Sequence, residues 1–468
     1  NREVEPMRYV STRGGAEPQG FFDVLLGGLA PDGGLYLPER WPQLPPLDRL
    51  RGRPYAEVAA EVMWPFVAGE FERAEFDALV ADTYAVFDHP DVCPVRNLGD
   101  GLYLTELFWG PTLAFKDVAL QLVGRLFDVA LRRRGERLTV LGATSGDTGS
   151  AAMEGCRHSD AVEVFILFPD GRVSEVQRRQ MTTLADPSLH AVAVEGDFDD
   201  CQRLVKAAFA DEAFRTEVNL GAVNSINWAR VMAQIVYYVT SHLAVSPDGA
   251  PVSFAVPTGN FGNVFAGWAA QAMGLPVGRL IVASNRNDIL VRFLDRGAMV
   301  AADVVATSSP SMDIGVSSNF ERLLFEATSR DGGACAATMA AFAADGEYRV
   351  LPEVHGTITD YFDGVRVSED EVDEEMAAWH RRGLMVEPHS AIGLRAAEAR
   401  RVPGVPIVAL ATAHPAKFPD AVEAATGVRP ELPEALADLL ERPEHAYAVA
   451  ADLADVQNLM RAHADDGR

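Results

Sequence analysis

Lysine is the residue that this sequence most lacks. Of its 41 basic residues only three are lysines (Lys116, Lys206 and Lys417), and the remaining 38 are arginines. Arginine therefore supplies nearly all of the positive charge, and each lysine marks a position where an amine is used instead. A deprotonated amine can attack a carbonyl to form a Schiff base, whereas a guanidinium cannot. The three lysines are thus the first candidates for chemistry.

The chain also lacks the features of several classes of protein. Its 67 acidic residues outnumber the basic ones and give a net charge of −26, which argues against nucleic acid or an anionic membrane as a partner. No apolar run approaches the roughly 18–20 residues of a membrane span, and no signal peptide is visible, so we expect a cytoplasmic protein. The expected partner is a small molecule, and the protein is expected to be a monomer or a homodimer.

Cysteine and histidine are too scattered to suggest a metal site or a disulfide framework. The four cysteines form no C-x-x-C pair, which favours reduced, buried thiols. No two histidines have the spacing of a helical metal site, so we predict no metal. An acidic chain of this kind needs a local positive pocket if its ligand is an anion.

The 468 residues are enough for two or three domains. From Leu102 onward, short apolar runs alternate with helical patterns, which predicts parallel sheets covered by helices on both faces. Before that point lie a short strand at 7–11 and a helical stretch at 55–87. The acidic stretch from Pro430 is predicted to be mostly helical. We predict four ranges: an N-terminal domain, two α/β domains and a C-terminal helical tail, at 1–96, 97–245, 246–428 and 429–468.

The stretch Gly110–Asp117 is the first candidate for a catalytic site because it contains Lys116. The lysine follows an apolar Leu-Ala-Phe triplet and opens a predicted helix over 116–134. Desolvation and the positive end of a helix dipole both lower the pKa of an amine. Our hypothesis is that Lys116 carries pyridoxal phosphate; the alternative is an ordinary lysine at the start of a helix.

A second stretch, Gly259-Asn-Phe-Gly-Asn263, lies between a predicted buried strand and a helix. Two glycines let the backbone curl so that its N–H groups converge, and the helix behind adds partial positive charge. This pattern favours a phosphate site without lysine, although a tight strand-to-helix turn without a ligand would look the same. The G-x-x-G spacing is not that of a dinucleotide or nucleoside triphosphate site.

Two further stretches lie at strand ends. The loop Thr144–Thr148 precedes a helix, where hydroxyls and free N–H groups suit a carboxylate or another oxyanion, or serve as an ordinary helix cap. Thr412 ends a strand predicted at 407–411, where its hydroxyl could bond a heterocyclic nitrogen or complete a turn.

Taken in order, these stretches resemble threonine synthase. The resemblance rests on Gly110-Pro-Thr-Leu-Ala-Phe-Lys-Asp117, Ser145-Gly-Asp-Thr-Gly-Ser150, Pro257-Thr-Gly-Asn-Phe-Gly-Asn263 and Ala411-Thr-Ala-His-Pro-Ala-Lys-Phe418. Further matching stretches are Gly171–Ser174 with Gln177–Thr182, Asn224–Arg230, Ser311–Arg322 and Glu387–Ser390. The match extends to about residue 425 and includes the N-terminal segment of the longer form of that family.

The resemblance implies the fold type II (tryptophan synthase β-like) architecture of pyridoxal phosphate enzymes, with two parallel-sheet domains and an N-terminal extension. It implies conversion of O-phospho-L-homoserine and water to L-threonine and phosphate, by elimination and β-addition. Lys116 would bind pyridoxal phosphate covalently and act in catalysis. The other implied cofactor contacts are Gly259, Asn260, Phe261, Gly262 and Asn263 at the phosphate, Thr412 at the ring nitrogen and Asp147 near the phenolic oxygen.

The resemblance also implies which residues bind the substrate. The carboxylate would lie on the loop that contains Thr144, Ser145 and Thr148, with Thr112 nearby. The candidates for the leaving phosphate, which the sequence does not rank, are Arg178, Ser225, Asn227, Arg230, Ser317 and Asn319.

Two positions depart from the family pattern. Trp109 and Asp170 stand where the family usually has histidine. The change at Trp109 replaces an ionisable ring three residues before Thr112. It leaves a second activity open, that of a phospholyase or a replacement enzyme acting on a different, modified amino acid.

Overall fold

The chain folds into two compact units, each built from non-contiguous segments. The computed structural model describes residues 5–157 and 159–464. One unit comprises residues 1–119 and 225–430, and the other comprises 120–224 and 431–468. Residues 1–4 of the predicted N-terminal domain and residues 465–468 of the predicted C-terminal tail lie outside the described residues. The four predicted domain ranges stay a prediction.

The first unit is organised on a six-stranded sheet. Five of its strands are parallel, and β3 pairs antiparallel with β4 at one edge. The strand order is β13 (Phe362–Arg366), β10 (Val277–Ser284), β9 (Val252–Pro257), β14 (Ile407–Ala411), β4 (Leu102–Glu106) and β3 (Val95–Gly99). Every residue of β9 and β14 is buried, as expected for central parallel strands covered on both faces.

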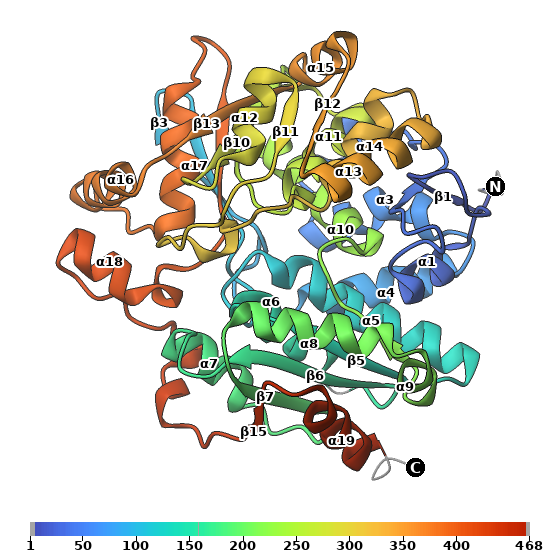
Figure 1. The fold of residues 1–468 in the computed structure, drawn as a ribbon. Coiled ribbons are helices and arrows are strands. Elements are labelled where there is room, and N and C mark those ends of the chain that lie inside the picture. The colour runs from blue at the N-terminus through green and yellow to red at the C-terminus, as the bar shows by residue number, and fades with distance from the viewer. Residues whose placement is uncertain (1–4, 158, 465–468) are drawn as a thin grey trace. The chain divides into compact units, whose positions relative to one another are not determined.

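Helices cover this sheet. The helix α17, labelled in Figure 1, packs against β14, β9 and β10. The helix α10 packs against α11 and α3. The helices of the unit are α1 (Phe21–Gly27), α2 (Leu47–Leu50), α3 (Tyr55–Val67), α4 (Arg73–Tyr84), the start of α5 (Lys116–Arg134), α10 (Trp228–Val245), α11 (Gly262–Ala272), α12 (Ile289–Arg296), α13 (Phe320–Ala327), α14 (Gly332–Asp345), α15 (Pro352–Thr359), α16 (Glu369–Arg381), α17 (Pro388–Ala399) and α18 (Pro419–Thr426).

Two small antiparallel sheets complete the first unit. The pairs are β1 (Tyr9–Ser11) with β2 (Tyr36–Pro38), and β11 (Ala298–Val300) with β12 (Glu347–Arg349).

The second unit contains a five-stranded parallel sheet. Its order is β15 (Tyr447–Ala450), β7 (Leu189–Glu195), β6 (Val162–Pro169), β5 (Leu138–Ala143) and β8 (Leu220–Gly221). In Figure 1, α8 crosses β5 and β6, against which it packs. The remaining helices are α6 (Asp147–Cys156), α7 (Glu175–Thr182), α8 (Phe198–Ala210), α9 (Glu212–Glu217) and α19 (Leu453–Ala464).

The C-terminal stretch differs from the sequence prediction of a mostly helical segment. Residues 447–450 form β15, which pairs in parallel with β7. The four residues Tyr-Ala-Val-Ala are too few to show a periodicity that distinguishes a strand from a short helix. Pairing with the exposed edge of β7 decides their conformation.

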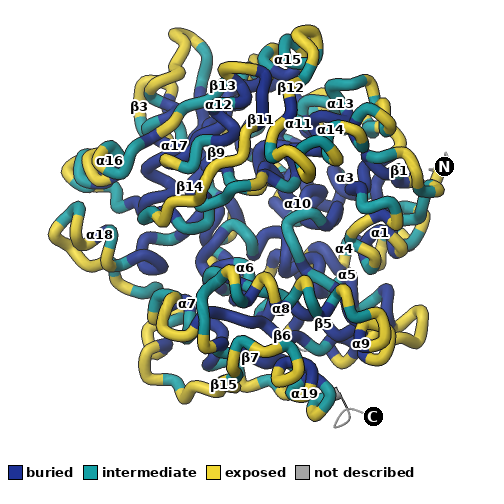
Figure 2. Tube along the Cα trace, viewed as in Figure 1, coloured by how far each residue is buried: buried dark blue, intermediate teal, exposed yellow. Residues whose placement is uncertain are grey.

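Figure 2 distinguishes buried from exposed residues, and the buried apolar side chains form two hydrophobic cores. The first core packs side chains of α17 and α16 against the central strands of the six-stranded sheet. The second core lies under α8 and α19 on the five-stranded sheet. All four cysteines are buried thiols. Within residues 5–157 and 159–464, no helix has both the length and the apolar composition that a membrane span requires.

Several elements match their sequence signals closely. The helix α5 covers 116–134 and β14 covers 407–411, as predicted. The predicted capping box at Ser368 is present, since its side chain accepts from the N–H of Glu371 and the Glu371 carboxylate accepts from the N–H of Ser368.

A pair of glycines sets the approach of α5 and α6 in the second unit. A Cβ added to Gly155 would lie 2.3 Å from the carbonyl oxygen of Leu120, and one added to Gly124 would lie 1.9 Å from that of Gly155. Gly155→Ala should therefore force the helices apart and lower the free energy of unfolding by about 3 kcal/mol. Denaturant titration of the variant measures this loss.

The control is Gly356→Ala in α15, where no atom lies within 4 Å of the added Cβ. That change should be neutral or stabilise the protein by up to about 1 kcal/mol, because alanine favours helix more than glycine does. Equal stability losses in the two variants would contradict the close-contact explanation.

Candidate active site

Three neighbouring parallel strands deliver the main candidate residues to one edge of the six-stranded sheet. The strand β4 leads to the Lys116 turn, β14 leads to Thr412, and β9 leads to the Gly259 loop. Because these strands are parallel and adjacent, their carboxyl ends meet at the same edge, where ligands bind in folds of this type. Residues from three distant parts of the sequence are thereby brought together.

The turn that leads to Lys116 is bonded to the segment after β14. The N–H of Phe115 donates to the carbonyl of Thr412 at 2.8 Å, and the N–H of His414 donates to the carbonyl of Leu113 at 2.9 Å. Leu113 has a φ of 63°, an unusual conformation for a leucine that makes the turn tight. These bonds fix the start of α5, and with it Lys116, against the strand end that carries Thr412.

The predicted substrate residue Thr112 is held by Asp117, the residue after Lys116. The Asp117 carboxylate, fully buried, accepts from the N–H of Thr112 at 2.8 Å and from its hydroxyl at 2.6 Å. A Cβ on Gly110 would lie 2.4 Å from the Cβ of Asp117, so only glycine fits there. The lysine is thus flanked by a rigid, hydrogen-bonded turn.

The Gly259 loop has the geometry of an anion site. Phe261 precedes α11 in the left-handed region, with φ of 67°, and no side-chain hydrogen bond caps the helix. A Cβ on Gly259 would lie 2.7 Å from the carbonyl oxygen of Ser311, so the backbone path requires glycine. The first-turn N–H groups of α11 and the helix dipole are left to a ligand.

The outward carbonyls of this loop are already bonded. Ser317 donates its hydroxyl to the carbonyl of Gly259 at 2.7 Å, and the N–H of Asn319 donates to that of Asn260 at 3.0 Å. In a trans peptide the N–H points opposite the carbonyl. The N–H groups of Asn260 and Phe261 therefore point away from the 317–319 segment, as a phosphate cradle requires.

Asn263 is turned toward α10. Its side-chain oxygen accepts from the hydroxyls of Tyr237 at 2.5 Å and Tyr238 at 2.8 Å. Its Nδ2 is buried and has no hydrogen-bond partner among the described residues. A buried amide donor beside an uncapped helix N-terminus fits an oxyanion, and the loop as a whole fits the phosphate of pyridoxal phosphate.

The sequence prediction missed the group that supports this loop from behind. The fully buried Glu387 accepts from the N–H of His389 at 2.8 Å and from its Nδ1 at 2.7 Å, so Nε2 of His389 is an acceptor. That Nε2 accepts from the N–H of Ser311 at 3.2 Å, and Ser311 lies against Gly259. The stretch Glu387–Ser390 matches the family pattern, but only the fold shows what these residues contact.

Among the described arginines of the first unit, Arg230 and Arg322 are buried. Arg322 donates to the carbonyls of Tyr36 and Ile226 and to the side chain of Asn319. Arg230 is 2 % exposed, and its Nε and Nη1 have no hydrogen-bond partner within the described part of the chain. Burial lowers the pKa of Arg322 to about 9 and that of Arg230 to about 10, so both are cations at neutral pH.

The other phosphate candidates in this unit have structural bonds. The amide of Asn227 donates to the carbonyl of Leu25, and that of Asn319 donates to the carbonyl of Ser225. The hydroxyl of Ser225 lies 3.4 Å from that of Ser318. Arg230 therefore stands apart from them as a buried cation with unpaired donors.

The remaining candidates lie in the second unit. The Thr144 hydroxyl accepts from the N–H groups of Gly146 and Gly149, both at 2.9 Å, and so shapes the loop before α6. Asp147 is buried and its carboxylate accepts from Gln177 at 3.0 Å. Ser145 and Thr148 are half-buried beside it.

Arg178 of α7 pairs with the C-terminal segment of the same unit. Its Nε lies 2.9 Å from Glu444, whose carboxylate also accepts from Thr182 at 2.9 Å. Both members of the ion pair are about one-third exposed, so the pair is weak and solvent-screened.

Trp109 occupies a half-buried place beside the first core. Its Nε1 donates to Glu106 at 3.4 Å, and its ring lies 5.1 Å from that of His89. Asp170, the other departure, is exposed in the second unit.

His414 lies in the segment after β14 that meets the Lys116 turn. Burial lowers its pKa to about 4, against a weaker opposing effect of the Glu387 carboxylate. Its Nδ1 accepts from the N–H of Ala416 at 3.0 Å, and its ring meets that of Phe108 edge-on at 5.3 Å. The imidazole is therefore neutral at pH 7.

This pKa predicts a loss of stability in acid. The unfolded chain binds the His414 proton near pH 6.5 and the folded chain only near pH 4, so stability falls as the pH drops between these values. The loss amounts to about 3 kcal/mol at most. His414→Asn keeps an acceptor for Ala416 and cannot titrate, so its thermal midpoint should fall less between pH 7 and pH 4.5. If the thermal midpoints of the wild type and of His414→Asn fall equally between pH 7 and pH 4.5, His414 is not the group that causes the loss of stability.

Comparison with known proteins extends the geometric evidence. Family models match residues 8–84 (threonine synthase N terminus), 93–353 (pyridoxal-phosphate dependent enzyme) and 390–460 (threonine synthase, C-terminal). The chain is 52 % identical to a threonine synthase of Pseudomonas aeruginosa over 99 % of this chain and 100 % of that protein.

Solved structures agree. A threonine synthase from Brucella melitensis with bound pyridoxal phosphate superposes with a TM-score of 0.96 at 49 % identity, covering 98 % of this chain and 99 % of that one. The yeast threonine synthase superposes with a TM-score of 0.93 at 37 % identity, with full coverage of both chains. These matches confirm the predicted resemblance, fold class, cofactor and activity. The chain belongs to the threonine synthase family of pyridoxal-phosphate-dependent enzymes.

Proposed function

We propose that this chain converts O-phospho-L-homoserine and water into L-threonine and phosphate, with Lys116 as the residue that binds pyridoxal phosphate. The observation that carries the proposal is the meeting of the Lys116 turn, Thr412 and the Gly259 loop at the ends of three adjacent parallel strands. When bound, pyridoxal phosphate supplies an electron sink for carbanion chemistry.

The protein itself holds the cofactor and transfers protons. The Gly259–Asn263 backbone and the Asn263 amide hold the cofactor phosphate. Thr412 bonds the ring nitrogen, and Asp147 lies near the phenolic oxygen. Lys116 moves protons between Cα, Cβ and Cγ of the substrate, for which its fixed place at the start of α5 is suited.

The substrate is held at its two charged ends. The N-terminus of α6, with Thr144, Ser145 and Thr148, binds the carboxylate, and Thr112 lies beside the reacting carbons. At the other end, Arg230 stabilises the leaving phosphate. Its unpaired buried donors support this role over the bonded candidates, which are Ser225, Asn227, Ser317 and Asn319. Arg178 is the alternative cation, at present paired with Glu444.

Trp109, which stands where the resemblance implies histidine, is the observation behind a second candidate activity. A phospholyase or a replacement enzyme for a modified amino acid would use the same cofactor site but a different route after phosphate departure. We further propose a cytoplasmic location and a monomer or homodimer that binds only small molecules. The strongly negative charge supports the absence of nucleic acid binding.

The deciding experiment is a product assay with O-phospho-L-homoserine. Threonine and phosphate in equal amounts are expected, whereas 2-oxobutanoate or no turnover would favour the second activity. Lys116→Ala should lose the visible absorbance of the bound cofactor and at least about 10³-fold in kcat, because the variant lacks both the cofactor attachment and the amine that moves the protons. Normal turnover by this variant would refute the role of Lys116.

Arg230→Met gives a test in which stability and activity should separate. Removing an uncompensated buried charge should leave the thermal midpoint unchanged or raise it. Losing the cation should lower kcat/KM by about 10²-fold and weaken inhibition by inorganic phosphate. Arg178→Met is the matched comparison, and a larger activity loss there would transfer the role to Arg178.

A further inference from the structure

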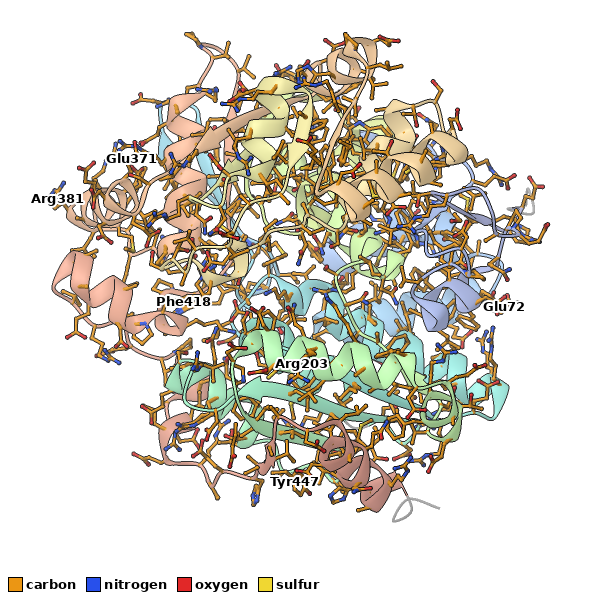
Figure 3. The ribbon with its side chains drawn as sticks, in the orientation of Figure 1. Glu72, Arg203, Glu371, Arg381, Phe418 and Tyr447 are labelled. Carbon is orange, nitrogen blue, oxygen red and sulfur yellow. The ribbon has the colours of Figure 1, made fainter. Side chains whose placement is uncertain are left out.

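Lys417 is a second buried lysine next to the Lys116 turn. It lies in the short segment between β14 and α18, directly before Phe418, which is labelled in Figure 3. Its side chain is fully buried, and its Nζ donates to the carbonyl of Thr112 at 2.7 Å. Neither the sequence motifs nor the proposed catalytic roles give it a task.

Burial of an ammonium group is costly unless its donors find acceptors. The chain uses arginine at 38 of 41 basic positions, yet a lysine stands here. An ammonium is a compact point donor, whereas a guanidinium is a broad planar fork. The site therefore suits a compact cation that donates to the carbonyl of Thr112 inside a packed turn.

The bond from Lys417 completes a closed set of contacts around Lys116. Thr112, whose carbonyl Lys417 binds, is itself bound through N–H and hydroxyl to Asp117. At the next residues of the turn, the N–H of His414 donates to the carbonyl of Leu113 and the N–H of Phe115 donates to the carbonyl of Thr412, which joins the same two segments. The turn is thus fastened to the segment after β14 by three contacts in a row, at Thr112 by the Lys417 side chain and at Leu113 and Phe115 by backbone bonds.

Phe418 extends this arrangement toward the phosphate loop. Its ring lies 4.9 Å from that of His389, and His389 accepts from the N–H of Ser311 behind Gly259. The segment that carries Lys417 is therefore held by the same group that supports the loop.

We propose that Lys417 is a positioning residue that holds the Lys116 turn against the strand end carrying Thr412. Its role is one of position: by donating to the carbonyl of Thr112, Lys417 sets the place of Lys116. The effect of Lys417 on catalysis rests on the proposed role of Lys116. The hold of Lys417 on the turn, through the carbonyl of Thr112, can be tested without that role.

The small number of lysines makes the test direct. In the full-length protein freed of cofactor, an acylating reagent can label three lysines, each quantified by mass spectrometry. Lys206 in α8 is exposed and serves as the internal standard. In Lys417→Met, labelling of Lys116 relative to Lys206 should rise at least about threefold, and hydrogen exchange at the amides of Phe115 and His414 should rise about tenfold.

Kinetics of the cofactor-loaded enzyme give an independent readout. Misplacement of Lys116 should lower kcat by about 10- to 100-fold with little change in KM, because positioning rather than binding is lost. Lys206→Met, the same change at an exposed site, should leave hydrogen exchange and kinetics as they are. Lys417→Arg keeps a charged donor and should restore part of the exchange protection.

Unchanged labelling of Lys116 and unchanged exchange in Lys417→Met would overturn the proposal. If that variant does not fold, Lys417→Gln decides, because its shorter, uncharged side chain cannot reach the carbonyl of Thr112 in the same way. Labelling of Lys116 should then rise at least about twofold, and wild-type labelling would overturn the proposal. Addition of pyridoxal phosphate to the wild type should block labelling of Lys116. If Lys116 is still labelled in the presence of pyridoxal phosphate, the proposed function is contradicted. The comparison of Lys417→Met with the wild type would remain valid in that case.

Discussion

The pairing of β14 with β4 on one side and β9 on the other is the constraint on which the site depends. β14 is a fully buried five-residue strand, and its carboxyl end receives backbone bonds from the Lys116 turn. Lys116 and Thr412 are 296 positions apart (412 − 116), yet a main-chain bond from Phe115 to Thr412 joins their segments. Because parallel strands align their carboxyl ends, one register fixes the turn, the threonine and the phosphate loop together.

An acidic protein obtains its positive site from the interior rather than the surface. The chain carries a net charge of −26, but the first unit encloses Arg230, Arg322 and Lys417 with little or no exposure. Arg322 and Lys417 bind backbone carbonyls, so each cation also organises a segment of the site. Away from water such charges act more strongly on an anion than surface charges do, since screening is weak.

Much of the local structure could be predicted because its signals are local. The Ser368 capping box, the arginine-rich end of α5 and the apolar runs of β9 and β14 each encode one element within a few residues. The candidate loops at Gly259 and Thr412 were likewise visible as turn chemistry after a strand. By contrast, β15 depends on the edge of β7, and β3 is an antiparallel strand that only its pairing with β4 reveals.

By itself the sequence determined the candidates: a rare lysine at a helix start, a glycine loop suited to phosphate and a threonine at a strand end, in an order that resembles one family. Tertiary structure decided what each side chain does. It turned Asn263 toward two tyrosines, placed Glu387 and His389 behind the phosphate loop and joined Lys417 to the turn of Lys116. The reason is physical, since burial and hydrogen bonding between segments hundreds of residues apart leave no periodic trace in either segment.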